Sequence, residues 1–228
     1  MTIDGPVLAM DTATSLGSVA VGEGDRLLAE AVIGVEVRHS EALLPAIAFV
    51  LQRAGLSPRD LAAIAVGGGP GSFTGVRIAA ATAKGMARAL ERPLIAFRSL
   101  EVLAVSAGLH RGPICALFDA RRGEVYAACY RRGEDGRVEE LMAPVARPIA
   151  RVIEEVRPYS PLFAGPGAVV SAAVIREHGG RLATGPVALP RASALLWLTA
   201  TEPDRGFVEH PAAWQPGYAR VPGARPMK

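Results

Sequence analysis

The sequence predicts a duplicated α/β fold with two lobes, each with a mixed sheet. One observation behind this prediction is an order of elements that occurs twice along the chain. An apolar strand ends in an acidic residue, and a tight turn, two more strands and helical material follow. A fixed β-β-β-helix unit that repeats is typical of a duplicated fold. The other observation is that 50% of the 228 residues are hydrophobic, which is enough to bury a sizeable core.

The first copy of the unit lies in "VLAMDTATSLGSVAVGEGDRLLAEAVI", residues 7–33. We expect a strand that ends at Asp11, a second strand from Gly17 to Gly22, and a third that begins at Arg26. A helix is predicted from Ser40 to Ala54, because apolar residues recur there at helical spacing. These apolar residues are Leu43, Leu44, Ile47, Leu51 and Ala54.

The second copy lies in "PICALFDARRGEVYAACYRRGEDGRVEEL", residues 113–141. Its first strand ends in Asp119, and the alternating "EVYAACY" and a glycine turn precede a third strand. Helical segments are expected at 146–156 and 168–178. The predicted lobes are residues 1–107 and a smaller C-terminal lobe of residues 108–228, with the last residues flexible. The first lobe should end near Ala107, and the second should start near Pro113.

The two cysteines, Cys115 and Cys129, lie in the segments predicted to be paired strands of the second copy. A two-residue turn at Arg121 and Arg122 would place them on opposite sheet faces, because side chains alternate along a strand. A shift of one residue would place them opposite each other, so the register decides. We expect reduced cysteines in the core, where free cysteine is commonly found.

The acidic residues Asp11 and Asp119 stand at matching places of the two copies. One strand-end carboxylate per lobe, facing a common cleft, is the layout of the actin-like, sugar-kinase and Hsp70 ATPases, in which such carboxylates organise a metal and its nucleotide. The alternative is structural, because an aspartate in a turn commonly bonds its own backbone. The pattern leaves both readings open and does not by itself indicate catalysis.

A glycine-rich loop lies within "AVGGGPGSFTGVRIAAATAKG", residues 65–85, between a predicted strand and a predicted helix. Such loops often hold phosphates. The P-loop pattern Gly-x-x-x-x-Gly-Lys-Ser/Thr is missing, and Lys84 lies well along the helix. A loose dinucleotide pattern is present at Gly69, Gly71 and Gly75.

Two features of the surrounding sequence argue against a dinucleotide site at this loop. Pro70 removes a backbone donor from the middle of the proposed cradle. The next strand, Pro93 to Phe97, ends at Arg98 with no acidic residue for a ribose, although an arginine there suits a phosphorylated ribose. The structural alternative makes Ser72 or Thr74 the helix N-cap and uses the glycines for close backbone approach.

Charge and hydropathy limit the classes of function. The formal net charge is +3, and no basic stripe with interleaved aromatic residues is present, so binding of nucleic acid by this chain alone has little support. The N-terminus lacks the charged and apolar regions of a signal peptide. No apolar run approaches the roughly 20 residues that a membrane span needs. We therefore expect a cytoplasmic protein without a membrane partner.

Several stretches together resemble the TsaB (YeaZ) family: "LAMDTATSLGSVAV", "HSEALLPAI", "AGLSPRDLAAIAVGGGPGSFTGVRIAAATAKGMA" and "DARRGEVYAACY". The resemblance runs from about Val7 to Tyr130 and continues more faintly through "LFAGPGA". The combination of "HSE…LLP" with "GPGSFTGVR" is far more specific than a glycine motif alone. It implies the duplicated actin-like ATPase (ASKHA, ribonuclease H-like) fold.

The resemblance also implies a role for the chain. Family members are non-catalytic, dimerising subunits in the bacterial synthesis of N6-threonylcarbamoyladenosine in tRNA. The implied partner is the related TsaD-type transferase, and a TsaE-type ATPase joins the two in a larger complex. The resemblance also implies that the chain forms a homodimer when it is alone and meets tRNA only through the complex. No cofactor is implied. The alternative reading is an autonomous nucleotide-dependent enzyme, ATPase-like or NADP-binding, that uses the glycine loop with Asp11 and Asp119.

Two groups of residues follow from the resemblance. The helices Ser40–Ala54 and Thr74–Leu90 correspond to those that pack against the same pair in a partner or second copy. The implied interface positions are Leu43, Leu44, Ile47, Leu51, Ala79, Ala83 and Met86. The implied remnants of a nucleotide cleft are Asp11, Thr12, Gly69, Gly71, Ser72 and Asp119.

The catalytic relative carries a His-x-x-x-His motif just after the loop-helix unit, which places two imidazoles on one helix face. Here "FRSLEVLAV" has Ser99 and Leu103 at the two positions. The remaining histidines, His39, His110, His178 and His210, show no ligand spacing. We therefore expect neither a catalytic residue nor a metal site in this chain.

Overall fold

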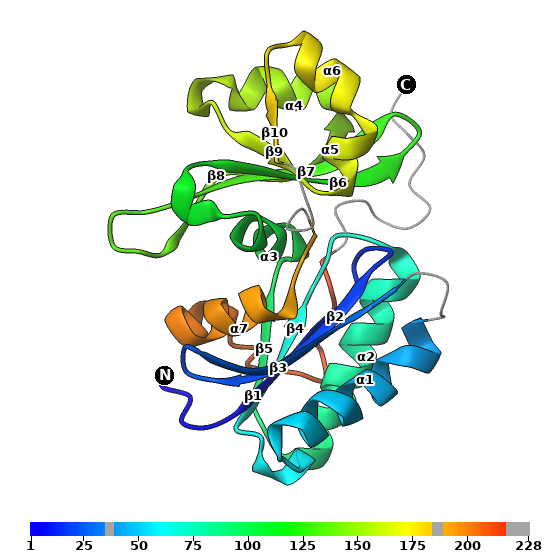
Figure 1. Ribbon diagram of the computed structural model, residues 1–228, viewed down its shortest axis with the longest axis vertical. Coiled ribbons are helices and arrows are strands. Elements are labelled where there is room, and N and C mark those ends of the chain that lie inside the picture. Colours follow the sequence, from blue (N-terminus) through cyan, green and yellow to red (C-terminus); the bar gives the residue numbers. More distant parts are fainter. Residues whose placement is uncertain (35–38, 184–188, 218–228) are drawn as a thin grey trace.

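The computed structural model describes residues 1–34, 39–183 and 189–217, and these form two α/β lobes, each on a five-stranded sheet (Figure 1). Both sheets contain antiparallel and parallel pairs. The predicted duplicated fold with mixed sheets is therefore confirmed. The first strands of each lobe, β1 and β2 in one and β6 and β7 in the other, pair antiparallel as expected.

The sheet of the first lobe has the strand order β3-β2-β1-β4-β5. Its strands are β1 (Val7–Asp11), β2 (Gly17–Glu23), β3 (Arg26–Ile33), β4 (Ala63–Gly67) and β5 (Leu94–Phe97). The central strands β1 and β4 are buried along their whole length. Apart from Asp11 at the end of β1, both strands consist of apolar residues and glycine, because helices cover both faces of the sheet.

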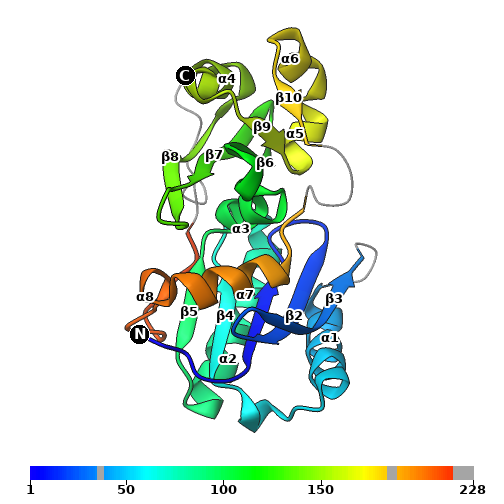
Figure 2. The ribbon, with the colours of Figure 1, turned by 60° about the vertical axis from the view of Figure 1, so that its left-hand side comes forward.

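Two helices cover one face of this sheet, and they are α1 (His39–Ala54) and α2 (Phe73–Leu90). Helix α2 begins after Ser72, whose Oγ accepts a hydrogen bond from Gly75 N at 3.3 Å, so Ser72 is the N-cap. The helix α7 (Ala192–Thr201) covers the opposite face (Figure 2). Helix α3 (Ser99–Ser106) contacts both α7 and the second sheet, and it therefore lies between the lobes.

The sheet of the second lobe has the order β10-β9-β6-β7-β8. Its strands are β6 (Ile114–Arg121), β7 (Glu124–Arg132), β8 (Val138–Pro148), β9 (Leu162–Ala164) and β10 (Arg181–Leu182). Its helices are α4 (Ile149–Val156), α5 (Pro166–Val170) and α6 (Ala172–Glu177). These helices cover the face away from the first lobe, and α3 covers the other face (Figure 1).

The C-terminal part of the chain returns to the first lobe. Helix α7 packs its leucines against the alanine-rich face of β1, β2 and β4, and Phe207 pairs with Ile95 of β5 after the short helix α8 (Pro203–Gly206). The predicted boundary, with residues 108–228 in one lobe, does not describe this segment. The reason is that α3 alone leaves most of this sheet face uncovered, and α7, apolar on all sides, fills it. The prediction that the last residues are flexible concerns a segment that, from residue 218 onward, lies outside the described part.

Three short 3-10 turns complete the described elements, and they are η1 (Pro58–Asp60), η2 (Leu109–Arg111) and η3 (Arg157–Tyr159).

The register of β6 and β7 places Cys115 directly opposite Cys129. A bulge between Asp119 and Arg121 provides the one-residue shift, and the chain turns through residues with positive φ, among them Arg122 at 56°. Both thiols are free and buried, and burial raises the pKa of both, that of Cys129 to about 12. The register that the sequence left open is thus the shifted one, and both cysteines belong to the core.

Candidate partner surface and interlobe cleft

The glycine loop between β4 and α2 packs tightly on the turn between β1 and β2. A Cβ at Gly71 would lie 2.3 Å from Ala13 O, and a Cβ at Gly75 would lie 2.0 Å from Thr12 O. The two turns are joined by hydrogen bonds from Ser72 N to Ala13 O, at 2.7 Å, and from Thr12 Oγ1 to Gly75 O, at 2.6 Å. Glycine is required at both positions because backbone meets backbone.

The start of the loop is equally crowded. A Cβ at Gly67 would lie 1.8 Å from Asp11 Oδ2, and one at Gly68 would lie 3.2 Å from the Trp214 ring. A Cβ at Gly69 would lie 2.9 Å from Gly217 O. The C-terminal segment that carries Trp214 and Gly217 thus closes over the loop, and Gly217 N donates to Gly68 O at 2.8 Å.

The loop's N–H groups are largely used inside the protein. Gly68 N donates to Phe97 O at 2.7 Å, and Gly69 N donates to Ser99 Oγ at 3.1 Å. The N–H groups of Ser72 and Gly75 are also engaged, and Pro70 has none. A phosphate cradle needs N–H groups that point at the ligand. The geometry therefore favours the structural alternative, in which the glycines serve close packing.

Both strand-end aspartates bond their own turns. Asp11 Oδ1 accepts a hydrogen bond from Ala13 N at 2.8 Å, and Asp119 Oδ1 accepts one from Arg121 N at 2.7 Å. The two differ in burial, because Asp11 is 1% exposed and Asp119 is exposed at the surface. Strand β6 also continues past Asp119 to Arg121. The turn-forming alternative describes the local hydrogen bonds of both residues.

A cleft of about 600 Å³ separates the two lobes at these turns. Of the predicted cleft residues, those that line it are Gly71, Ser72 and Asp119. Those outside its lining are Asp11, Thr12 and Gly69, all buried behind it. The expectation that Asp11 and Asp119 face one cleft is therefore wrong for Asp11, whose carboxylate is enclosed by the glycine loop. Polar lining residues not predicted to line the cleft are Thr14, Ser15, Thr74, Arg121 and Tyr126. The sequence offered a signal for the residues that follow Asp11 and Asp119 in their turns and for Thr74 beside the glycine loop, but none for Tyr126.

The positions of the catalytic relative's two histidines have structural roles here. Ser99 is fully buried and accepts the hydrogen bond from Gly69 N, so it holds the glycine loop against α3. Leu103 is fully buried in the interlobe core with Phe118 and Tyr130. Across the described ranges, no group of three or more His, Cys, Asp or Glu residues is placed to hold a metal ion. In the same ranges, no helix has the length and apolar character to cross a membrane.

Most of the predicted interface positions belong to the core instead. They pack between the sheet and the helices, each at most 4% exposed, and are Leu43, Ile47, Leu51, Ala79 and Ala83. Met86 is half-buried against the same core. Only Leu44, at 59% exposure, lies on the surface. Helical periodicity identified the buried face of each helix, which is the face that packs on the sheet. The prediction that these buried positions face a partner is thus contradicted by their packing.

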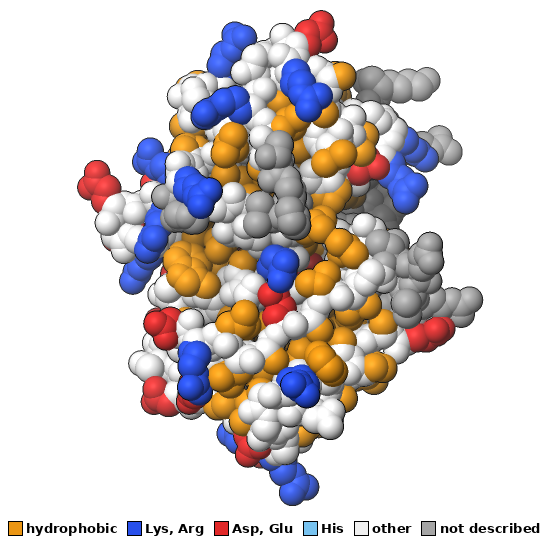
Figure 3. Space-filling view, viewed as in Figure 1, with side chains coloured by type: hydrophobic (Ala, Val, Ile, Leu, Met, Phe, Trp, Pro, Cys, Tyr) orange, Lys and Arg blue, Asp and Glu red, His pale blue; other side chains and the backbone are white. Residues whose placement is uncertain are grey.

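A different set of residues forms the exposed side of the same helices, which we call the outer α1–α2 face. Its members are Leu44, Ala48 and Phe49 of α1, and Phe73, Ala81, Gly85 and Ala89 of α2. Leu44, Phe49 and Phe73 are 59%, 52% and 46% exposed. Hydrophobic side chains also gather over the β3 and α1 side of the first lobe in Figure 3. An exposed apolar group of this kind marks an interaction surface more often than a chance cluster.

Gly85 is the unusual member of this face. It lies in the interior of α2, is exposed, and a Cβ built there meets nothing within 4 Å. A glycine inside a helix costs about 1 kcal/mol relative to alanine. Nothing in the described part of the protein requires the absence of a side chain at this position.

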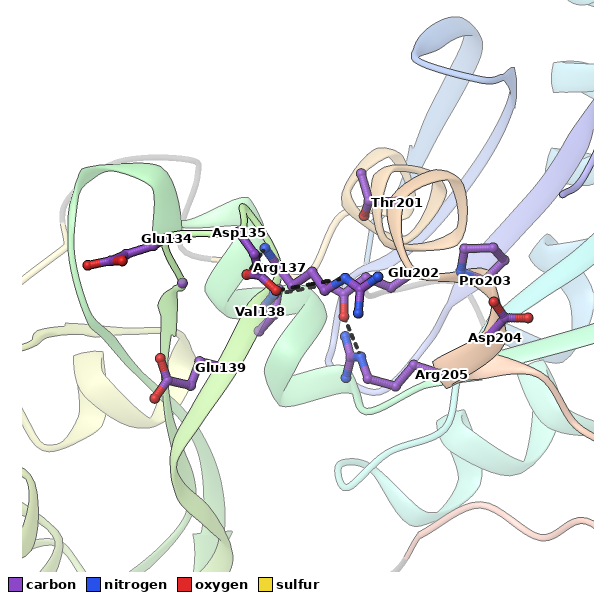
Figure 4. Close-up of a pocket in the computed structure, with 11 residues that line it drawn as sticks. Glu134, Asp135, Arg137, Val138, Glu139, Thr201, Glu202, Pro203, Asp204 and Arg205 are labelled. Carbon is purple, nitrogen blue, oxygen red and sulfur yellow. Dashed lines mark hydrogen bonds and ion pairs between the residues drawn. The ribbon is translucent and has the colours of Figure 1, made fainter. Parts of the chain in front are cut away.

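A second cavity, of about 690 Å³, lies between the β7–β8 hairpin and the end of α7 (Figure 4). Its buried acid, Glu202, accepts hydrogen bonds from Val138 N at 2.9 Å and from Arg205 Nε at 2.6 Å. Arg205 also pairs with Glu101 of α3, whose pKa is raised by burial. The bond from Val138 N to Glu202 therefore links the second lobe to the end of α7.

Comparison with known proteins places these features in a family. A family model described as "TsaD: tRNA N6-adenosine threonylcarbamoyltransferase" matches residues 34–170. The "tRNA threonylcarbamoyladenosine biosynthesis protein TsaB" of Bacillus subtilis is 38% identical over 136 residues, 60% of this chain and 59% of that protein. The protein of the same name from Escherichia coli is 40% identical over 132 residues, 57% of each. The matched part therefore spans less than two thirds of either relative's length.

Solved structures agree with the sequence relatives. "YeaZ from Pseudomonas aeruginosa" is 33% identical with a TM-score of 0.78, covering 94% of this chain and 99% of that one. The Acidaminococcus fermentans (R)-2-hydroxyglutaryl-CoA dehydratase component A has a TM-score of 0.50 over 89% of this chain and 99% of its own, at 11% identity, which concerns the fold alone. The two lobes and their mixed sheets have the actin-like (ASKHA-type) fold. Within that fold class, the chain belongs to the TsaB (YeaZ) family.

Proposed function

We propose that this chain is a non-catalytic subunit that pairs with a TsaD-type threonylcarbamoyl transferase in the synthesis of N6-threonylcarbamoyladenosine in tRNA. The names of the Bacillus subtilis and Escherichia coli relatives support the pathway. Under this proposal the protein acts in the cytoplasm, meets tRNA only through the complex, and joins a TsaE-type ATPase there. Alone, it forms a homodimer through the same surface.

The observation that carries the pairing is Gly85 on the outer α1–α2 face. An exposed glycine inside a helix is unfavourable for the monomer, and its benefit is that another helix can approach closely. Ala81 and Ala89, one turn away from Gly85 on either side, are small and exposed, and the neighbouring helix α1 carries the exposed apolar residues Leu44 and Phe49. Small exposed residues on one helix with exposed apolar side chains on its neighbour suit a helical partner surface.

The non-catalytic role is supported by the two residues that stand where the catalytic relative has metal-binding histidines. Ser99 and Leu103 occupy the positions of the relative's histidines, and a leucine cannot ligate a metal. The glycine loop uses its N–H groups internally, as described above. One observation favours the alternative of a nucleotide-dependent enzyme, namely the open interlobe cleft lined by Thr14, Ser15 and Asp119. ATP turnover by the isolated chain with magnesium would support that alternative.

The pairing is tested with Gly85→Arg, measured by size-exclusion chromatography with and without a TsaD-type transferase from the same source. We expect association to weaken at least about a hundredfold, because a bulky charge would stand in the centre of the interface. Folding should be unaffected or improved, since arginine is the better helix former. The matched control is Ala173→Arg, an exposed helix position on α6 of the second lobe. A folded Gly85→Arg protein that still associates like the wild type would contradict the proposed surface.

A further inference from the structure

A third cavity, of about 420 Å³, lies in the second lobe between the end of α4 and the end of α6. Its polar lining consists of Arg157, Ser160, His178 and Arg181. Its floor is made by Ile153 and Phe163, which are 4% and 3% exposed and belong to the core of the lobe. The residues come from two stretches of the chain, 153–163 and 178–181, which the fold brings together.

Both walls of this cavity are held by backbone geometry. Helix α6 ends in hydrogen bonds from Gly179 N to Arg176 O, at 2.9 Å, and from Gly180 N to Ile175 O, at 2.8 Å. A Cβ at Gly180 would lie 2.7 Å from Ile175 Cγ2, so the chain fits closely here. This paired pattern is a common, well-ordered helix termination.

The opposite wall ends the 3-10 turn η3. Ser160 adopts φ 47°, and its N–H donates to Arg157 O at 3.1 Å. His178 Nδ1 donates to Val174 O at 2.9 Å, which leaves Nε2 as the ring's other polar atom. The side chains of the cavity therefore start from ordered backbone, which lowers the entropic cost of binding a ligand.

Among the described residues, the acidic and basic side chains that line this cavity are arginines and a histidine only. No carboxylate lines it, as far as the described residues extend, and neither Arg157 nor Arg181 has an ion pair among them. Three other arginines of this lobe do have carboxylate partners, since Arg131, Arg147 and Arg151 contact Glu139, Glu155 and Glu154. Two guanidinium groups kept without a carboxylate across one cavity form a site for an oxyanion.

We propose that this cavity binds a phosphate group, held by the guanidinium groups of Arg157 and Arg181 with Ser160 and His178 as further hydrogen-bonding partners. Arginine suits phosphate because its planar fork of N–H donors matches two oxygens at once. Two sources share this chemistry, a small phosphate ligand and the sugar-phosphate backbone of an RNA. The proposal is independent of the pairing role, because it concerns the isolated chain and a different lobe.

The test is a titration of the isolated protein with inorganic phosphate, followed by the amide signals in ¹H–¹⁵N NMR spectra. Saturable shifts are expected at residues 157–161 and 178–182. Arg157→Gln and Arg181→Gln should each weaken the affinity about tenfold or more. The matched control is Arg176→Gln, an exposed arginine on α6 that forms no ion pair with the residues that the structure describes and does not line the cavity. It should change the affinity less than about twofold.

A second arm identifies the source of the phosphate, with a synthetic RNA hairpin as probe. If the hairpin binds, inorganic phosphate competes and both cavity variants weaken binding, the RNA backbone is the ligand. If only inorganic phosphate binds, the ligand is a small phosphate compound. Unchanged amide signals in the wild-type titration, or an equal loss in Arg176→Gln, would overturn the proposal. Association through the outer α1–α2 face should stay intact in all three variants, which separates this result from the test of pairing.

Discussion

Asp11 and Asp119 accept equivalent hydrogen bonds, each from the backbone N–H two residues further along the chain, in the first and second lobes respectively. The duplication is therefore preserved in the chemistry of the turn. It is not preserved in the surroundings, because Asp11 is enclosed by the glycine loop whereas Asp119 stands at the open cleft. The same side chain has a core role in one lobe and a surface role in the other.

This difference predicts unequal effects of the same substitution. Asp11→Ala should lower the free energy of unfolding by about 2–3 kcal/mol, because it leaves a buried backbone N–H without its acceptor. Asp119→Ala should cost about 1 kcal/mol or less, because water replaces the lost acceptor at the surface. Urea unfolding of both variants measures the difference. Equal losses would show that the burial of Asp11 has no energetic consequence.

The adjacent residues Leu43 and Leu44 provide a second test, because they are 1% and 59% exposed. Leu43→Glu should destabilise the fold by about 3–5 kcal/mol, since it buries an unpaired charge in the first core. Leu44→Glu should change stability by about 0.5 kcal/mol or less and weaken association instead. Thermal melting and size-exclusion chromatography of the two variants separate the effects. By the same reasoning, Leu51→Glu and Ala83→Arg should unfold the protein rather than only block pairing.

The third prediction concerns acid stability and Glu30, which joins β3 to the start of α7. Burial alone would raise the pKa of Glu30, but hydrogen bonds from Arg191, Ser193 and Ser18 outweigh it, and the pKa lies below its ordinary value of 4.5. A carboxyl whose pKa is lowered in the folded state stabilises the fold above its unfolded pKa and loses this contribution as the pH falls through the folded value. The contribution of Glu30 should therefore disappear below about pH 4.5.

Glu30→Gln tests this in unfolding experiments from pH 7 to pH 3. The wild type should lose stability more steeply on acidification than the variant, and the two curves should converge at the acid end. Glu101 has the opposite sign, because burial raises its pKa, but it is common to both proteins and cancels in the comparison. Parallel curves would show that the ion pair with Arg191 contributes nothing to folding.

The fourth prediction concerns the positions that correspond to the catalytic relative's histidines. The double variant Ser99→His, Leu103→His should create neither transition-metal binding nor activity, and it should be strongly destabilised. Both positions are fully buried, so two imidazoles would overpack the interlobe core. Elemental analysis and a melting curve provide the measurement. Ser99→Ala is the control, and it should cost about 1–3 kcal/mol through the lost acceptor for Gly69 N. A stable double variant that retains stoichiometric zinc would contradict this expectation.

The sequence predicted the three strands that open each lobe and the helices α1 and α2, because alternation and apolar runs report burial directly. The strands β9 and β10 and the helix α7 were not predicted, and the helix predicted from 146 begins at Ile149 because residues 146–148 belong to β8. The predicted strand from Gly17 to Gly22 differs from β2 by one residue. The sheet against which α7 packs was not predicted, because a helix that is apolar on all sides has no sequence pattern that identifies which of the two sheets it covers. The Cys115–Cys129 register depended on one bulge residue, which alternation alone does not reveal.

The candidate surface was predicted as a pair of helices but not as a set of residues. Leu43 and Leu44 are both apolar, so the pattern of α1 contains two apolar faces and cannot say which one the sheet takes. Gly85 is the exposed residue that indicates a partner surface most clearly, but in the sequence it is one glycine among 25. Its meaning depends on the open space above it, and only the packed structure provides that observation.

Helix α7 has a consequence for how this protein is made. On the ribosome the strands of the first lobe emerge early, but the alanine-rich face of β1, β2 and β4 waits for residues 192–201, which are synthesised after the second lobe. One apolar face of the first sheet must therefore stay exposed to water while the second lobe is translated. We therefore expect truncation before residue 192 to destabilise the first lobe, because a helix synthesised after the second lobe completes the first.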